Sequence, residues 1–110
     1  MAYDEELAER IREQLAGEPV EEKKMFGGLA FLVGGHMAVA ASGQGGLLVR
    51  CEPELTDALL GEPGVSPMEM GGRGPVEGWL RVSADAVADD DSLELWVERG
   101  LEYAQSLPPK

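Results

Sequence analysis

Residues 25–49 read MFGGLAFLVGGHMAVAASGQGGLLV and contain no Asp, Glu, Lys or Arg. At 25 residues the run is long enough to cross a membrane, but paired glycines break it into short apolar pieces. Gly34-Gly35 and Gly45-Gly46 permit the positive φ angles of tight hairpin turns. The run therefore predicts antiparallel strands over residues 25–33, 37–41 and 47–50, and no membrane span.

Two helices are predicted on either side of this run. Residues 4–16 place Asp4 at a candidate N-cap and follow it with an apolar stripe formed by Leu7, Ala8, Ile11 and Leu15. Residues 53–60 predict a short helix, because Pro53 suits a first helical turn and Gly61 a helix end.

A third and longer helix is predicted near the C-terminus. One face of it is apolar and consists of Leu93, Trp96, Val97, Gly100, Leu101 and Ala104. Asp91 and Glu94 have the spacing of a capping box, and residues 89–91 place three carboxylates at the positive end of the helix dipole. Before this helix, residues 79–82 alternate like an edge or near-edge strand.

This element order predicts an α+β fold. We expect a central, mostly antiparallel sheet of about five strands, flanked by N-terminal, middle and C-terminal helices. With 110 residues, 1–110 are expected to form one domain.

The charge is strongly acidic and unevenly placed. Nine Lys and Arg against 21 Asp and Glu give a net charge of −12, which opposes sequence-independent binding to nucleic-acid phosphates. Residues 1–22 carry two basic and eight acidic side chains, and residues 82–110 carry two and seven, so the middle is nearly neutral. Any surface that attracts anions is therefore expected between residues 23 and 81.

The cysteine count and the N-terminus indicate a cytoplasmic protein. One cysteine, Cys51, allows neither an intramolecular disulfide nor a cysteine-based zinc site. The first ten residues are acidic, whereas a signal peptide begins with basic and then apolar residues.

No residue has the surroundings that catalysis requires. Asp89, Asp90 and Asp91 are explained by helix capping, because consecutive residues at a helix start fan outward instead of converging on a cation. His36 lies beside a turn with no partner at a catalytic spacing, and Cys51 is expected to be a buried, passive thiol. The sequence predicts no catalytic residues, no metal and no cofactor, and hence no enzyme.

Basic residues of the central segment are the candidates for binding a ligand or a partner. Arg73 lies in the glycine-rich segment 71–74, which lacks the spacing of a phosphate-binding P-loop but could line a patch for a phosphate or a carboxylate. The full candidate set consists of the basic residues Lys23, Lys24, Arg50, Arg73 and Arg81, together with Trp79.

Five segments together resemble the TfoX (Sxy) N-terminal domain family. They are AYDEELAERIREQL at residues 2–15, EKKMFGGLAFLVGGHM at 22–37, LLVRCEPE at 47–54, GRGPVEGWLRV at 72–82 and LELWVERGLEYAQSLPPK at 93–110. The resemblance implies an α+β domain with a central antiparallel sheet and carries over no catalytic residues. In the founding members this domain is joined to a C-terminal domain and regulates competence genes with the cAMP receptor protein.

Two departures from that family bear on function. The chain is expected to be a single-domain member, which weakens the competence assignment. Glu77 also stands where a basic residue is common in the family, so any anion contact made by that residue is expected to be absent.

The sequence thus favours a non-enzymatic, cytoplasmic regulatory or interaction module. By family analogy its partner is a transcription factor or RNA polymerase, on which an acidic domain docks through a basic face. Direct DNA binding and membrane association are not expected, and unpaired sheet edges would permit a homodimer. The alternative is a domain that binds or senses a small anionic ligand.

Overall fold

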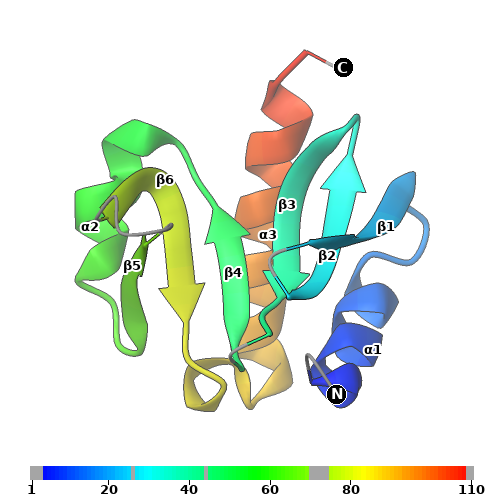
Figure 1. The fold of residues 1–110 in the computed structure, drawn as a ribbon, viewed down its shortest axis with the longest axis horizontal. Helices are drawn as coiled ribbons and strands as arrows, with labels where there is room; N and C mark the ends of the chain where they lie inside the picture. Colours follow the sequence, from blue (N-terminus) through cyan, green and yellow to red (C-terminus); the bar gives the residue numbers. More distant parts are fainter. Residues whose placement is uncertain (1–3, 26, 44, 70–74, 109–110) are drawn as a thin grey trace.

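The computed structural model describes residues 4–25, 27–43, 45–69 and 75–108 (Figure 1). In chain order its elements are α1 (Glu5–Gln14), β1 (Val20–Met25), β2 (Gly28–Val33), β3 (His36–Ala41), β4 (Leu47–Arg50), a 3-10 turn η1 (Pro53–Leu55), α2 (Thr56–Leu60), β5 (Val65–Glu69), β6 (Pro75–Val82), a second 3-10 turn η2 (Asp85–Val87) and α3 (Asp90–Ser106).

The six strands form one antiparallel sheet in the order β1-β2-β3-β4-β6-β5. At the tip of the β2–β3 hairpin, Val33 pairs with His36 and the two intervening glycines have φ values of 60° and 86°. The two-residue turn at Gly34-Gly35 is therefore confirmed, and so is the α+β class with an antiparallel sheet and three flanking helices.

The sheet has one strand more than expected, because two edge strands carry weak strand signals. β1 reads VEEKKM, and its charged side chains at 21–24 are exposed at the sheet edge. β5 reads VSPME, and its Pro67 is tolerated because an edge strand needs only one row of backbone hydrogen bonds. Residues 79–82 belong to the longer β6, which lies second from the edge.

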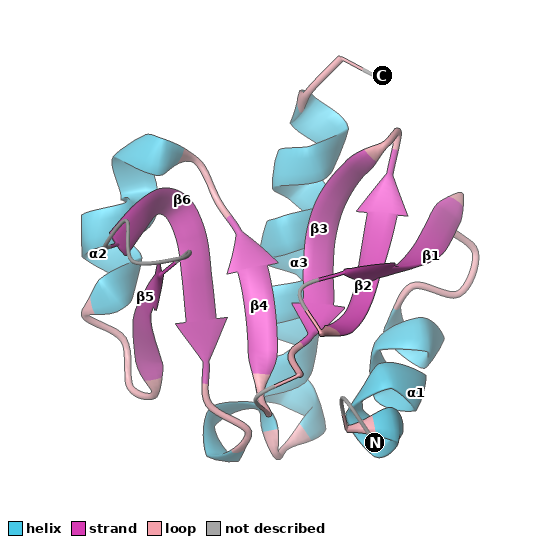
Figure 2. Cartoon of the chain, viewed as in Figure 1, coloured by secondary structure: helices cyan, strands magenta, loops and turns pink. Residues whose placement is uncertain are grey.

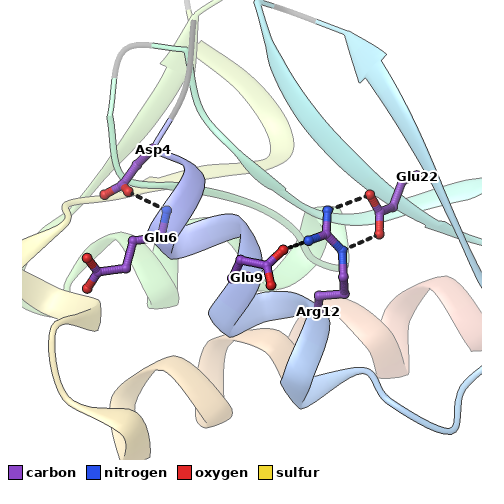
Figure 3. Close-up of polar contacts among 5 residues, drawn as sticks. All are labelled: Asp4, Glu6, Glu9, Arg12 and Glu22. Atoms are coloured by element: carbon purple, nitrogen blue, oxygen red, sulfur yellow. Dashed lines mark hydrogen bonds and ion pairs between the residues drawn. The ribbon is translucent and has the colours of Figure 1, made fainter. Parts of the chain in front are cut away.

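The helix starts confirm one predicted cap and correct another. Asp4 accepts a hydrogen bond from the backbone N–H of Glu6 at 3.0 Å (Figure 3) and another from the backbone N–H of Leu7 at 3.2 Å, as expected of an N-cap. The capping box predicted at Asp91 and Glu94 is wrong, because Asp91 already lies inside α3. Asp89 has the extended backbone of a cap and accepts from the Ser92 N–H at 2.8 Å, a bond that lowers the pKa of Asp89.

The helices and the main core share one face of the sheet. Figure 2 shows α3 running behind the strands, with α1 and α2 toward opposite ends of the sheet. The three helices and the η2 turn contribute side chains to this layer, and the strand side chains in it are Leu29, Phe31, Val39, Ala41, Leu47, Val49, Leu80 and Val82. Across the described ranges, none of the helices is both apolar enough and long enough to cross a membrane.

Candidate functional site

The opposite face of the sheet carries a continuous row of paired residues across all six strands. Each residue of the row is the cross-strand partner of the next, and the row is Lys23, Ala30, Ala40, Leu48, Arg81 and Ser66. Paired residues project on the same side of a sheet. Ala30, Ala40 and Leu48 form a second buried cluster with Met37 and Met68, and its described members all come from strands. This face is therefore distinct from the helix-covered one, and we call it the helix-free face.

By strand register, four of the six candidate binding residues leave the sheet on this helix-free face, although the guanidinium of one of them, Arg50, reaches the Tyr103 ring of α3. Lys23 and Arg81 lie near the two ends of the row. Arg50 and Trp79 form the next same-face pair along β4 and β6 after the pair of Leu48 and Arg81. Lys24 pairs with Leu29, a residue of the helix-covered core, and so projects on the other face. Arg73 lies outside the described residues.

The basic residues of the molecule fall into two groups. Arg10, Arg12 and Arg99 form ion pairs with carboxylates, and Figure 3 shows Arg12 between Glu9 and Glu22. In the described part of the chain, no ion pair engages the remaining cations, which are Lys23, Lys24, Arg50 and Arg81. Among the described residues, these four are the cations without an ion-paired carboxylate, in a protein with 21 acidic residues.

Arg50 is occupied by aromatic side chains. Its guanidinium carbon lies 4.9 Å from the ring centroid of Trp79 and 5.2 Å from that of Tyr103, so it links β6 to the C-terminal part of α3. Its Nε is buried and has no hydrogen-bond partner in the described ranges. The two stacking contacts give Arg50 a structural role that its position in the sequence does not reveal.

Arg81 instead lines a cavity of about 330 Å³. Its Nη1 donates a hydrogen bond to Ser42 Oγ at 2.9 Å, which fixes the side chain on the helix-free face. The other residues lining the cavity are small or carry hydroxyl groups, namely Gly45, Gly46, Gly64, Ser66, Ser83 and Ala84. Arg81 is thus the one predicted binding residue that lines a described cavity.

A second cavity, of about 350 Å³, lies on the helix-covered side between the η1–α2 segment and the last turns of α3. Its lining residues are Cys51, Glu52, Leu55, Leu59, Arg99, Glu102, Tyr103 and Ser106. Arg99 donates to Glu62 at 3.0 Å, and its charge is therefore compensated, whereas Glu52 and Glu102 have no ion pair in the described ranges. Leu55 is 47% exposed, so the cavity, which we call the Leu55 cleft, combines apolar surface with uncompensated negative charge.

The outward side of α3 carries a stripe of acidic residues beside this cleft. Asp91, Glu94, Glu98 and Glu102 recur at helical spacing on the side opposite the buried apolar stripe, and all four are exposed. None of them is in an ion pair within the described ranges. Leu95 lies among them and is 45% exposed. We refer to these five residues as the α3 acidic surface.

Cys51 and His36 have surroundings that explain them without chemistry. Burial raises the pKa of the Cys51 thiol, against the lowering effect of its contact with the Thr56 hydroxyl, so the thiol is protonated at neutral pH. His36 Nε2 forms a hydrogen bond of 2.7 Å with the backbone oxygen of Pro108 and so ties the β2–β3 hairpin to the chain after α3. Within the described residues, no group of three His, Cys, Asp or Glu is arranged to hold a metal ion.

Comparison with known proteins identifies the family. Residues 13–104, most of the chain, match the TfoX N-terminal domain. The chain belongs to the TfoX N-terminal domain family. The resemblance read from the sequence is thereby confirmed. Searches of curated proteins and of solved structures found no match.

Sequence reasoning chose neither the α3 acidic surface nor the Leu55 cleft as a candidate site, although helical spacing alone places Glu94, Glu98 and Glu102 on the side of the helix opposite its apolar stripe. Leu95 was the available signal, because it interrupts the acidic side of a helix whose apolar stripe is already complete without it. No local signal could have found the cleft, because its lining comes from residues 51–59 and 99–106, which only the fold brings together.

Proposed function

We propose that this TfoX N-terminal domain is a non-enzymatic, cytoplasmic regulatory module that docks on a basic surface of a protein partner through the α3 acidic surface. The observation that carries the proposal is that Asp91, Glu94, Glu98 and Glu102 line one exposed side of α3 and have no ion pair within the described residues. Among the described acidic residues, ion pairs engage Glu9, Glu22, Glu62 and Asp90, and what distinguishes the α3 acidic surface from other unpaired carboxylates is its arrangement along one helix around the exposed Leu95. The α3 acidic surface therefore keeps its full charge for a partner.

Both charge attraction and apolar contact contribute to this docking. Like charges along one helix cost stability unless they are relieved, and a basic partner relieves them while speeding encounter. Leu95 adds apolar surface in the middle of the acidic residues, and the Leu55 cleft adds more beside Glu102. An interface with an apolar centre and a charged rim is the usual arrangement in complexes between proteins.

Family membership supports the kind of partner. A competence-related regulator acts on transcription, and the partner classes are a DNA-bound transcription factor, such as the cAMP receptor protein, or RNA polymerase. Such proteins carry basic surfaces that face nucleic acid. Direct contact of this domain with DNA is disfavoured, because a net charge of −12 repels the phosphate backbone.

Binding of the purified domain to purified RNA polymerase and to a cAMP-receptor-type factor from the same organism, measured across a salt series, tests the proposal. We expect saturable binding to one of them that weakens steadily with added salt, because exposed charges are screened. Binding to neither protein at low salt, or an affinity that is independent of salt, would contradict it.

A further inference from the structure

The cavity that Arg81 lines is the strongest feature that docking through α3 leaves unexplained. It lies where β4 begins and β6 ends, and its polar side chains come from the helix-free face. The α3 acidic surface belongs to the other layer of the molecule. Whatever the cavity binds is therefore independent of the proposed docking surface.

We propose that this cavity binds the phosphate group of a small phosphorylated molecule. Arg81 supplies the charge, because its guanidinium has five N–H donors and the described residues take up one of them, the bond to Ser42. Since no carboxylate pairs with Arg81 in the described ranges, its charge is not already compensated. A planar, fixed guanidinium is well suited to bind phosphate with two parallel hydrogen bonds.

Two serine hydroxyls add donors next to the guanidinium. Ser66 is the direct cross-strand partner of Arg81, so the two side chains leave the sheet side by side. Ser83 Oγ accepts a hydrogen bond from the Ala86 N–H at 3.2 Å, and its own hydroxyl hydrogen remains available to donate to a ligand.

The composition of the cavity lining selects an anion. The residues that line it include no Asp or Glu, although acidic residues number 21 in the chain, and Arg81 is the formal charge of the lining. Three of its residues are glycines, two of which the fold itself requires. A Cβ at Gly46 would lie 2.4 Å from the Val82 carbonyl oxygen, and one at Gly64 would lie 2.6 Å from the Ala86 Cβ. Where Gly46 and Gly64 line the cavity, its wall therefore consists of backbone without side chains.

The size of the cavity limits the ligand. At about 330 Å³ it is at the lower end of the volumes of small-molecule sites, so it suits a phosphate or a short phosphomonoester rather than a whole nucleotide. Free inorganic phosphate and the phosphate of a metabolite share the chemistry that Arg81, Ser66 and Ser83 recognise. A titration with each of them separates the two sources.

NMR titration of the ¹⁵N-labelled domain with inorganic phosphate, and separately with glycerol phosphate, tests the proposal at constant ionic strength. We expect saturable shifts at the amides of Gly45, Gly46, Gly64, Ser66 and Ser83, and none with chloride. If glycerol phosphate binds more tightly than inorganic phosphate, the site is assigned to a phosphorylated metabolite. If the two bind equally, the site is assigned to inorganic phosphate. Absence of saturable shifts at these amides with either ligand would overturn the proposal.

Variants of Arg81, Ser66 and Lys24 locate the binding. Arg81→Gln should weaken it about tenfold or more, and Ser66→Ala by about two- to tenfold, because each loses hydrogen bonds to a charged ligand. Lys24→Gln removes the same charge from the other face of the sheet and should leave the affinity unchanged. If Arg81→Gln does not fold, Arg81→Lys keeps the charge without the forked geometry and should still weaken binding. Equal affinity in the wild type and in the Arg81 and Ser66 variants would overturn the assignment.

Discussion

Gly100 of α3 and Ala38 of β3 bring the helix and the sheet into backbone contact. A Cβ built on Gly100 would lie 2.3 Å from the Ala38 carbonyl oxygen and 2.8 Å from a methyl carbon of Val39. Both positions are buried, so α3 cannot rotate or shift at this point without opening the core. The close approach fixes which side of α3 faces solvent, and that side is the α3 acidic surface.

Gly100→Ala should destabilise the domain by about 2 kcal/mol. Alanine is better than glycine by about 1 kcal/mol in a free helix, but an overpacked core costs about 1–3 kcal/mol and the atom it meets here is backbone, which yields little. Urea denaturation measures the change. In the control Gly61→Ala, the new Cβ would meet Ala58 O at 3.4 Å, an ordinary contact, so a shift within about 0.5 kcal/mol is expected. Equal effects of the two substitutions would disprove the close-approach argument.

Glu22→Gln should make the domain less stable at neutral pH, by about 0.5 kcal/mol, with an effect that disappears in acid. Glu22 accepts two hydrogen bonds from Arg12, at 2.6 Å and 2.7 Å, and these bonds lower the pKa of Glu22 (Figure 3).

The pH dependence follows from the direction of that pKa change. A carboxyl whose pKa is lower in the folded state contributes stability above its unfolded pKa, near 4.5, and this contribution is lost as the pH falls through the folded value. Thermal unfolding of wild type and Glu22→Gln should therefore differ at pH 7 and converge as the pH falls below 4.5. A gap that stays constant with pH would contradict this reading of the pair.

Replacing Arg50 by Lys should cost about 1 kcal/mol, although the charge is kept. Lysine cannot stack a planar group between Trp79 and Tyr103, and cation–π contacts contribute about 0.5–2 kcal/mol according to their exposure. Tyr103→Phe is the matched control, because it keeps the ring and should leave stability unchanged, whereas Tyr103→Ala should approach the Arg50 variant. Urea denaturation measures the free energy of unfolding of the three variants. An Arg50→Lys variant as stable as the wild type would show that the stacking contributes nothing to stability.

Cys51 should react with a thiol reagent far more slowly in the folded domain than in urea. The residue is 4% exposed, and burial raises its pKa, so both access and thiolate content are low. The rate of modification at pH 8 with and without denaturant measures this. Comparable rates in the two conditions would indicate an accessible, reactive thiol and would reopen a chemical role for Cys51.

Local sequence signals predicted the parts of the fold that depend on neighbours along the chain. Gly34-Gly35 set the hairpin, Asp4 set the start of α1, and residues 47–50 formed β4 as expected. The edge strands β1 and β5 were missed, because exposed edge positions accept charged side chains and proline, which carry no alternation. The cap of α3 was placed two residues late, because any of three consecutive aspartates fits the composition of a cap.

The candidate sites were less predictable, because they depend on distant pairings. Arg81 could be chosen for its charge, but its neighbours Ser66 and Gly45 come from other strands and turns. Arg50 was chosen for the same reason and is instead held between two aromatic rings from β6 and α3. Charge alone could not distinguish the two arginines, since what separates them is which side chains lie beside each one: aromatic rings beside Arg50, and serines and glycines beside Arg81.

The most direct test of docking through α3 compares the partner affinity of two double variants. Glu94→Lys with Glu98→Lys reverses charge in the α3 acidic surface, and Glu13→Lys with Glu21→Lys raises the net charge by the same amount on α1 and β1. The wild-type residues are all exposed and without ion pairs in the described ranges. We predict that the first variant loses affinity for the partner by about tenfold or more at low salt, while the second stays close to wild type. Equal losses in the two variants would show that net charge and not the α3 surface governs binding, which would contradict the proposed docking site.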